Sequence, residues 1–321
     1  MASEQAAAIK TRLREFAASI DPKASLEELR AIYDGFAALT AEPTGITWTE
    51  VDAAGVPSIW ADAGGGATDR VLQYVHGGGY VIGAAKYYRN LTGHLAKAIG
   101  CRVLNVDYRL APEHPHPAAV DDSTAAYKWL LDQGIDPKHI AIAGDSAGGG
   151  LTVATLLNIK KQRLPMPAAA MPISPWIDME CTGESMSTRA TADVLVSAAM
   201  LKVMSDGFLQ GQDSKDPLAA PLHGDLRGLC PLYIQVGDEE TLLDDSTRLA
   251  RLTSEAGVET RIDVFPEMQH VFQIAAGNMP EADDAIQRLA DWVRPRLGLS
   301  ARHRSPLDAT GERRHQMTTA G

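Results

Sequence analysis

The sequence has few cysteines, an excess of acidic over basic side chains, and no long hydrophobic run. Its three cysteines, Cys101, Cys181 and Cys230, show no ligand spacing, which favours free thiols in a reducing compartment over disulfides or a metal site. The net charge of −11 argues against nucleic acid as a partner. No apolar run approaches membrane-spanning length and residues 1–5 do not resemble a secretory signal, so we expect a cytoplasmic protein without membrane association.

What the sequence has instead is a regular alternation of short apolar strands and helices. This pattern predicts a mostly parallel sheet with helices on both faces, which is an α/β fold. The expected strands are 71–75, 101–106, 140–143, 168–172, 232–236 and 261–265, preceded by two strands at 46–51 and 56–61. The expected helices between them are 87–100, 118–134, 147–160, 242–256 and 281–297.

Three further segments stand outside this alternation. Residues 1–40 carry two amphipathic helices, the second opened by a capping box at Ser25 and Glu28. Residues 178–220 contain no strand signal and have helical signals over 190–209, so we interpret them as an insertion into the main domain, 41–298. We expect these two segments to form a helical cap, and the polar residues 299–321 to be a disordered tail.

The segment that carries chemistry is Gly144-Asp145-Ser146-Ala147-Gly148, between an apolar strand and an apolar helix. A serine in this strand–turn–helix context is lifted out of the sheet to act as a nucleophile, and the flanking glycines avoid a clash with neighbouring backbone. A turn of small residues with an idle serine is the alternative, and the correct pattern on both sides argues against it.

A glycine run follows the first strand of the alternation, at His76-Gly77-Gly78-Gly79. Its backbone N–H groups lie unshielded at the sheet edge that also carries Ser146. Two of them, with the N–H of Ala147, can hold the negative oxygen that develops when a serine attacks a carbonyl group. A flexible loop is the alternative reading of the glycine run taken alone.

A serine nucleophile needs a histidine base. Four histidines follow Ser146, namely His223, His270, His303 and His315. We select His270, because it follows the strand 261–265 by a short loop and so lies at the same sheet edge as the serine. The orienting acid should follow the strand 232–236, where Asp238, Glu239, Glu240, Asp244 and Asp245 are all candidates. We reject His114 and His116 as a metal pair, since no further ligand lies at suitable spacing.

In combination these residues resemble the bacterial hormone-sensitive-lipase-like carboxylesterases, which are α/β-hydrolases. The resemblance rests on four segments, His76–Gly79, Asp107–Glu113, Gly144–Gly149 and His270–Phe272, and covers residues 70–297. It implies Gly78, Gly79 and Ala147 as oxyanion donors, His76 and the segment 108–113 as scaffold, and Glu240 as the acid. Glu240 replaces the aspartate usual in the family. The resemblance is closest to the branch of monoterpene ε-lactone hydrolases, and it implies a possible homodimer.

The sequence therefore predicts a serine carboxylesterase for small, short-chain esters, with the catalytic residues Ser146, Glu240 and His270. We expect no metal and no cofactor. From their positions, Tyr80 and Trp176 are candidates for the substrate pocket, as are residues 193–200. A lactonase or an amidase on the same residues is an alternative. A small-molecule receptor is a further one, although receptors on this scaffold have lost the histidine that is present here.

Overall fold

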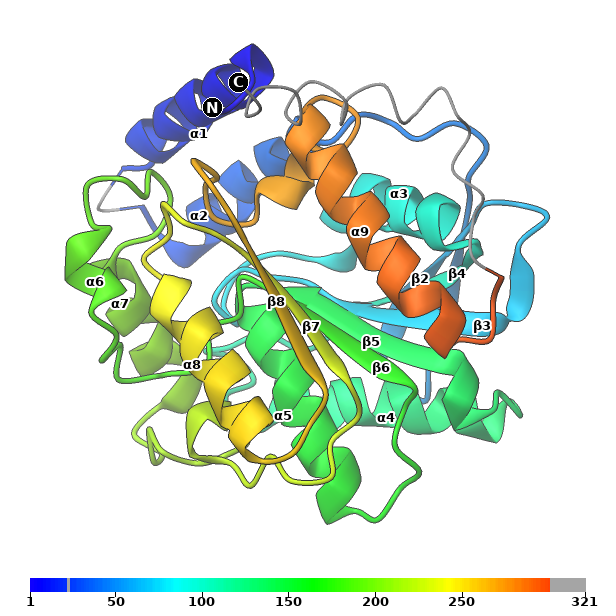
Figure 1. The fold of residues 1–321 in the computed structure, drawn as a ribbon. Helices are drawn as coiled ribbons and strands as arrows, with labels where there is room; N and C mark the ends of the chain where they lie inside the picture. Colours follow the sequence, from blue (N-terminus) through cyan, green and yellow to red (C-terminus); the bar gives the residue numbers. More distant parts are fainter. Residues whose placement is uncertain (22–23, 301–321) are drawn as a thin grey trace, which may run out of the picture.

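A sheet of eight strands forms the centre of the computed structural model, which describes residues 1–21 and 24–300 (Figure 1). Its strand order is β1-β2-β4-β3-β5-β6-β7-β8, and β2 runs antiparallel to its neighbours β1 and β4 whereas all other adjacent strands are parallel. The strands are β1 Thr47–Asp52, β2 Pro57–Asp62, β3 Ala67–Val75, β4 Cys101–Val106, β5 Ile140–Asp145, β6 Ala169–Ile173, β7 Leu232–Gly237 and β8 Thr260–Phe265. The predicted α/β fold is confirmed.

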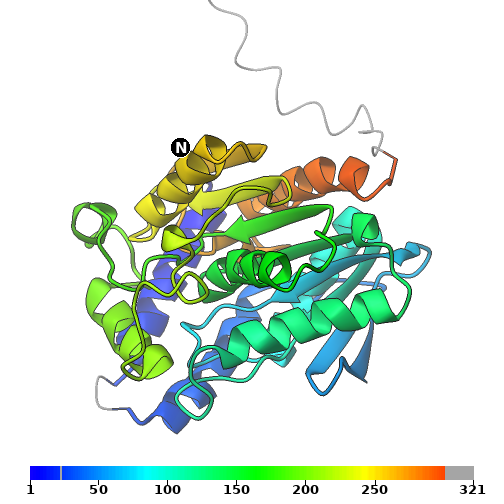
Figure 2. The ribbon, with the colours of Figure 1, turned by 90° about the horizontal axis from the view of Figure 1, so that it is seen from below.

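Helices cover both faces of this sheet (Figures 1 and 2). The covering helices are α3 Arg89–Ile99 and α9 Pro280–Arg296 on one face, and α4 Ala118–Asp132, α5 Ala147–Lys161 and α8 Leu243–Glu255 on the other. Alternate residues of β5 enter the two layers, with Ile140 and Ile142 packed on the side of α5 and Ala141 and Ala143 on the side of α9. Burial on both faces explains why β5 is an unbroken apolar run.

The N-terminal segment consists of α1 Glu4–Ser19, α2 Leu26–Ile32 and the 3₁₀ helix η1 Tyr33–Leu39. Helix α1 buries Ala6, Ile9 and Leu13 against the layer that contains α9. The predicted capping box of α2 is present. Arg30 on α2 donates to both carboxylate oxygens of Glu113, at 2.8 Å each, which ties the helix to the loop after β4.

The inserted segment contains α6 Ser185–Thr188 and α7 Ala198–Leu209. Helix was expected over 190–209, and this is wrong for residues 190–197. The carboxylate of Asp193 accepts hydrogen bonds from the N–H groups of Leu195 and Val196, which forms a turn, and Ser197 then caps α7 by accepting from Met200.

The other short elements are 3₁₀ turns, and the C-terminal residues close the described chain. These turns are η2 Ala85–Tyr88, η3 Pro137–His139, η4 Pro221–His223 and η5 Phe272–Ala275. Of the expected tail, residues 301–321 lie outside the described residues. Leu299 packs against the core, and the Ser300 carbonyl accepts a hydrogen bond from Arg294 at 2.9 Å.

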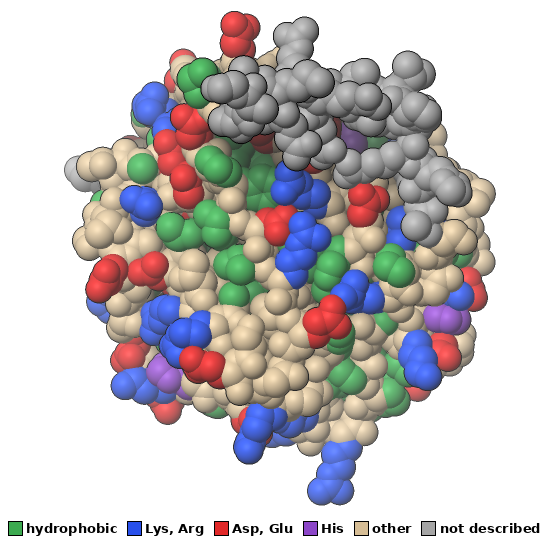
Figure 3. Space-filling model, viewed as in Figure 1, with side chains coloured by type: hydrophobic (Ala, Val, Ile, Leu, Met, Phe, Trp, Pro, Cys, Tyr) green, Lys and Arg blue, Asp and Glu red, His purple; other side chains and the backbone are tan. Residues whose placement is uncertain are grey.

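The surface carries charges of both signs. On the face seen in Figure 3, acidic and basic side chains are interspersed with one another. Within residues 1–21 and 24–300, every helix is too short or too polar to cross a membrane.

The turn between β5 and α5 depends on two very close backbone contacts. A Cβ on Gly144 would lie 2.4 Å from the carbonyl oxygen of Val75, and a Cβ on Gly148 would lie 2.1 Å from the same atom. Real side chains do not approach backbone so closely, so β3 and α5 can approach each other only because these two residues are glycine. The clash expected from the sequence is confirmed.

We predict that Gly148→Ala destabilises the protein by about 2 kcal/mol or more, because the added methyl group must displace β3 backbone. Thermal unfolding measures the effect. Gly35→Ala is the matched control, since no atom lies within 4 Å of the Cβ built at Gly35. Equal unfolding temperatures for the two variants would contradict the prediction.

Candidate active site

Ser146 lies at the tip of the turn that joins β5 to α5. Its backbone has φ 55° and ψ −121°, a conformation that residues other than glycine rarely adopt. The Ser146 N–H donates to the carbonyl oxygen of Ile173 on β6 at 2.8 Å, which fixes the turn against the neighbouring strand. The side chain is half-buried, and it lines a cavity together with His270.

His270 lies in the loop after β8 and is held by Glu240. The Nδ1 atom of its ring is 2.8 Å from Oε2 of Glu240, and both side chains are buried. The other oxygen, Oε1, accepts hydrogen bonds from Ser174 Oγ at 2.7 Å and from the Gly237 N–H at 2.5 Å. With the proton on Nδ1 shared with Glu240, Nε2 is left to accept a proton.

For each residue of this pair, burial and the neighbouring groups shift the pKa in opposite directions. Burial alone would lower the pKa of His270, but the hydrogen bond and charge of Glu240, together with the charges of Asp193 and Asp145, give a net rise. Burial raises the pKa of Glu240, while the bonds from His270, Gly237 and Ser174 favour its charged form. The raised histidine pKa makes Nε2 a stronger base, which is active only while the ring is neutral.

The other acidic candidates bind elsewhere. Asp238 accepts from the N–H of Glu267 at 2.6 Å, and Glu239 pairs with Lys10 of α1 at 2.7 Å. Asp244 accepts from the N–H of Ser185, and Asp245 accepts from the N–H groups of residues 177 and 178. Of the five candidates, Glu240 is the one that meets His270.

The glycine loop after β3 lies beside the serine. Gly78 and Gly79 have φ values of 114° and 60°, and both line the cavity that contains Ser146. Among the described residues, the N–H groups of Gly78, Gly79 and Ala147 donate no hydrogen bond within the protein. They are therefore available to an oxygen atom placed at the serine, at the N-terminus of α5 where partial positive charge also favours an anion.

The scaffold of this loop includes His76 and Tyr108, as the resemblance implied, and a polar cluster around Asp145 that the sequence did not predict. Asp145, next to the serine, accepts hydrogen bonds from Tyr74 Oη at 2.7 Å, Tyr88 Oη at 3.0 Å and the Gly77 N–H at 3.1 Å. His76 stacks on Tyr108, with ring centroids 4.4 Å apart. Tyrosines in apolar segments are typical of a hydrophobic core, so the sequence did not indicate that the hydroxyl groups of Tyr74 and Tyr88 donate hydrogen bonds to Asp145.

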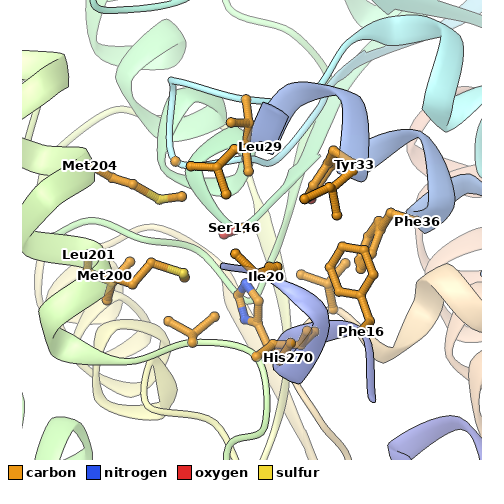
Figure 4. Close-up of a pocket in the computed structure, with 18 of the residues that line it drawn as sticks. Phe16, Ile20, Leu29, Tyr33, Phe36, Ser146, Met200, Leu201, Met204 and His270 are labelled. Carbon is orange, nitrogen blue, oxygen red and sulfur yellow. The ribbon is translucent and has the colours of Figure 1, made fainter. Parts of the chain in front are cut away.

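The cavity over Ser146 is almost entirely apolar, and its volume is about 100 Å³. Side chains from the N-terminal segment and from the insertion face each other across it (Figure 4). They are Phe16, Ala17, Ile20, Leu29, Ile32, Tyr33 and Phe36 from the first, and Leu195, Val196, Met200, Leu201 and Met204 from the second. The two segments therefore supply most of the wall of the cavity over the serine.

Tyr80 and Trp176, expected from their positions to line the pocket, are not among its lining residues. Both side chains are buried in the core behind it. Tyr80 has φ 65° and stacks on Phe208, with centroids 3.9 Å apart, and Trp176 Nε1 donates to the carbonyl of Asp178 at 3.0 Å.

Across residues 1–21 and 24–300, no three His, Cys, Asp or Glu side chains are grouped so as to hold a metal ion. Cys101, Cys181 and Cys230 are free thiols.

Comparison with known proteins shows the family to which the chain belongs. A family profile described as alpha/beta hydrolase fold matches residues 72–274. This chain belongs to the α/β-hydrolase family. It is 44% identical over 229 residues to an acetyl-hydrolase of Streptomyces hygroscopicus, covering 71% of this chain and 77% of the relative. It is 35% identical to an esterase of Acinetobacter venetianus, covering 83% and 88%.

Solved structures narrow the family further. The crystal structure of an esterase from the bacterial hormone-sensitive lipase family superposes with a TM-score of 0.90 at 43% identity, covering 93% of this chain and 100% of the other. The resemblance to hormone-sensitive-lipase-like esterases is therefore confirmed, and so is the prediction of an enzyme that hydrolyses carboxylic esters.

We predict that Ser146→Ala abolishes ester hydrolysis and leaves the fold intact. Loss of the nucleophile of such a triad lowers kcat on the order of 10⁶-fold. Steady-state hydrolysis of a p-nitrophenyl ester measures the loss, with circular dichroism as the control for folding. A folded variant with more than a tenth of the parent activity would rule out Ser146.

The second prediction concerns the acid. Glu240→Gln should lower kcat by roughly 10⁴-fold, because the imidazole loses its orienting charge and its tautomer. Asp238→Asn is the matched control, since Asp238 follows the same strand but binds Glu267, and it should change kcat little. If the Asp238→Asn variant is inactive and the Glu240→Gln variant is nearly as active as the parent, the orienting acid is Asp238 and not Glu240.

Proposed function

We propose that the protein hydrolyses short-chain carboxylic esters through an acyl-enzyme, with Ser146 as nucleophile, His270 as base and Glu240 as the orienting acid. The observation that carries the proposal is that the strained Ser146 lines one apolar cavity together with His270, whose ring is held by the buried Glu240. An ester bound there places its carbonyl carbon at the serine and its oxygen at the free N–H groups.

In the first half-reaction, Nε2 of His270 takes the proton of the Ser146 hydroxyl as its oxygen attacks the carbonyl carbon. The developing oxyanion accepts hydrogen bonds from the N–H groups of Gly78, Gly79 and Ala147. Glu240 stabilises the imidazolium that forms. The tetrahedral intermediate then collapses, and His270 returns the proton to the leaving alcohol.

In the second half-reaction, water replaces the alcohol. His270 takes a proton from the water, the resulting hydroxide attacks the acyl carbon, and the same N–H groups hold the second oxyanion. The carbon–oxygen bond to Ser146 breaks, and the serine recovers its proton from His270. The carboxylic acid is released and the free enzyme is restored.

The size of the cavity supports the preference for short chains. A dry cavity of about 150 Å³ in a protein core accepts the six carbons of benzene. The cavity here is smaller, at about 100 Å³, which favours short acyl chains over long ones. Its apolar walls would not compensate an additional charge on the substrate, so we infer neutral esters of small acids.

Lactones and amides would use the same residues, and no observed contact favours either over an open-chain ester. A homodimer and a cytoplasmic location remain predictions from the sequence.

Met204 should limit the chain length. Its Sδ lies 2.1 Å from where a Cβ on Gly79 would stand, so the thioether rests directly on the proposed oxyanion loop. We predict that Met204→Ala raises the ratio of kcat/KM for octanoate to that for butyrate about tenfold, because the shortened side chain admits more methylene groups. A series of p-nitrophenyl esters from acetate to decanoate measures the ratio.

The matched control is Val203→Ala, on the adjacent residue of α7, whose side chain is 72% exposed and does not line the cavity. It should leave the profile unchanged. A parent enzyme that prefers decanoate to butyrate would contradict the short-chain proposal. An unchanged ratio in Met204→Ala would show that Met204 does not set the limit.

A further inference from the structure

The carboxylate of Asp193 is buried in the insertion and has an unusual set of partners. One oxygen, Oδ1, accepts from the N–H groups of Leu195 and Val196 at 2.9 Å each. The other, Oδ2, accepts from the Thr241 N–H at 2.9 Å and from Thr241 Oγ1 at 3.1 Å. A single side chain thus joins the wall of the cavity to the loop of the catalytic acid.

Both ends of this connection are close to the proposed chemistry. Thr241 follows Glu240 directly, so its backbone position influences where the Glu240 carboxylate stands. Leu195 and Val196 line the cavity over Ser146. Displacement of Asp193 would therefore change both the shape of the substrate pocket and the position of the catalytic pair.

The residues that flank Asp193 are bound to the histidine loop. Gln269, which precedes His270, accepts from the Val194 N–H at 2.9 Å and donates to the Ala192 carbonyl at 3.1 Å. Gln269 also donates to Glu239, which in turn binds Lys10 of α1 at 2.7 Å. The segment 192–194 is therefore held between the loop of the acid and the loop of the base.

The charge of Asp193 also acts on the histidine. Three carboxylates interact electrostatically with the His270 ring: Glu240 from the loop after β7, Asp193 from the insertion, and Asp145 from the end of β5. All three are buried, so solvent screens them less than it screens surface charges. Each one favours the protonated ring.

We propose that Asp193 is a second carboxylate of the catalytic centre, a positioning residue that fixes the acid loop and the cavity wall together and stabilises the imidazolium form of His270. This proposal rests on the proposed function, because it assigns to His270 the role of base. Glu240 orients the ring by direct contact, whereas Asp193 acts through Thr241 and through its charge.

The consequence for pH follows from the sign of that charge. His270 must be neutral to accept the serine proton, so activity is lost as the pH falls through its raised pKa. Removal of the Asp193 charge lowers this pKa. The acid limb of the pH profile should then move to lower pH, while kcat on the plateau falls because the imidazolium of the transition state is less stabilised.

The experiment compares Asp193→Asn with Asp213→Asn. Asp213 is an exposed residue of the same insertion. Its carboxylate accepts a hydrogen bond from the N–H of Lys215, two residues further along the chain, at 2.9 Å, and Asp193 accepts from Leu195 in the same way. Asn can keep the oxygen that accepts from Leu195 and Val196. It removes the charge, and it replaces the oxygen that accepts from the Thr241 N–H with an amide NH₂ group. The pH dependences of kcat and of kcat/KM for p-nitrophenyl butyrate are measured for both variants and the parent, after thermal unfolding has confirmed that they fold.

We expect the acid limb of the Asp193→Asn profile to shift to lower pH by a few tenths of a pH unit or more, and its plateau kcat to be lower than that of the parent. The acid limb of the Asp213→Asn profile should coincide with that of the parent. Equal acid limbs in all three proteins would overturn the proposal. A parent that hydrolyses no ester, or retains full activity without Ser146, would instead overturn the proposed function.

Thr241→Val provides a second arm, which also decides the case if Asp193→Asn does not fold. It removes the hydroxyl donor and leaves the Asp193 charge in place. We expect a lower kcat with an unmoved acid limb. A downward shift of the limb in Thr241→Val would show that the loop contact, and not the charge, sets the histidine pKa, and would overturn the electrostatic role.

Discussion

The site depends on the left-handed backbone of Ser146. This conformation costs on the order of 1–3 kcal/mol for a residue other than glycine, so it persists only where its surroundings enforce it. Three contacts do so here: the hydrogen bond from Ser146 to Ile173 on β6, the close approach of α5 to β3 allowed by Gly148, and the polar cluster around Asp145. The strain is balanced by the packed sheet and presents the hydroxyl group at its edge.

Everything else at the site is arranged around that hydroxyl. The parallel strands β3, β5, β7 and β8 end at one edge of the sheet and deliver, in turn, the glycine loop, the serine, the acid and the histidine. The two helical segments line the cavity over Ser146 with apolar side chains (Figure 4). Beside these apolar side chains, hydrogen bonds to a developing charge are stronger than in water, and the buried carboxylates act on His270 with little screening.

Much of this could be predicted from the sequence. Strand and helix periodicity predicted the sheet and its two covering layers, and the strand–turn–helix motif located Ser146.

Other features could not be predicted. Glu240 and Asp238 could not be separated by spacing alone, because both follow β7 within reach of a histidine. Tyr80 and Trp176 do not line the cavity over Ser146, and local adjacency in sequence does not reveal which way a side chain points. The helix expected at 190–197 was replaced by a turn, because Asp193 binds backbone N–H groups there. The cavity wall and the role of Asp193 depend on contacts between segments far apart in sequence, which periodicity does not report.

The most direct test of the account is covalent labelling of the folded protein with a p-nitrophenyl phosphonate ester, followed by intact-mass analysis and peptide sequencing. Attack by an activated serine releases p-nitrophenolate and leaves a stable tetrahedral phosphonyl group in the oxyanion site. The account predicts one adduct per chain, on Ser146, formed in step with the loss of activity and absent from the unfolded protein. An adduct on another residue, or loss of activity without any adduct on Ser146, would contradict it.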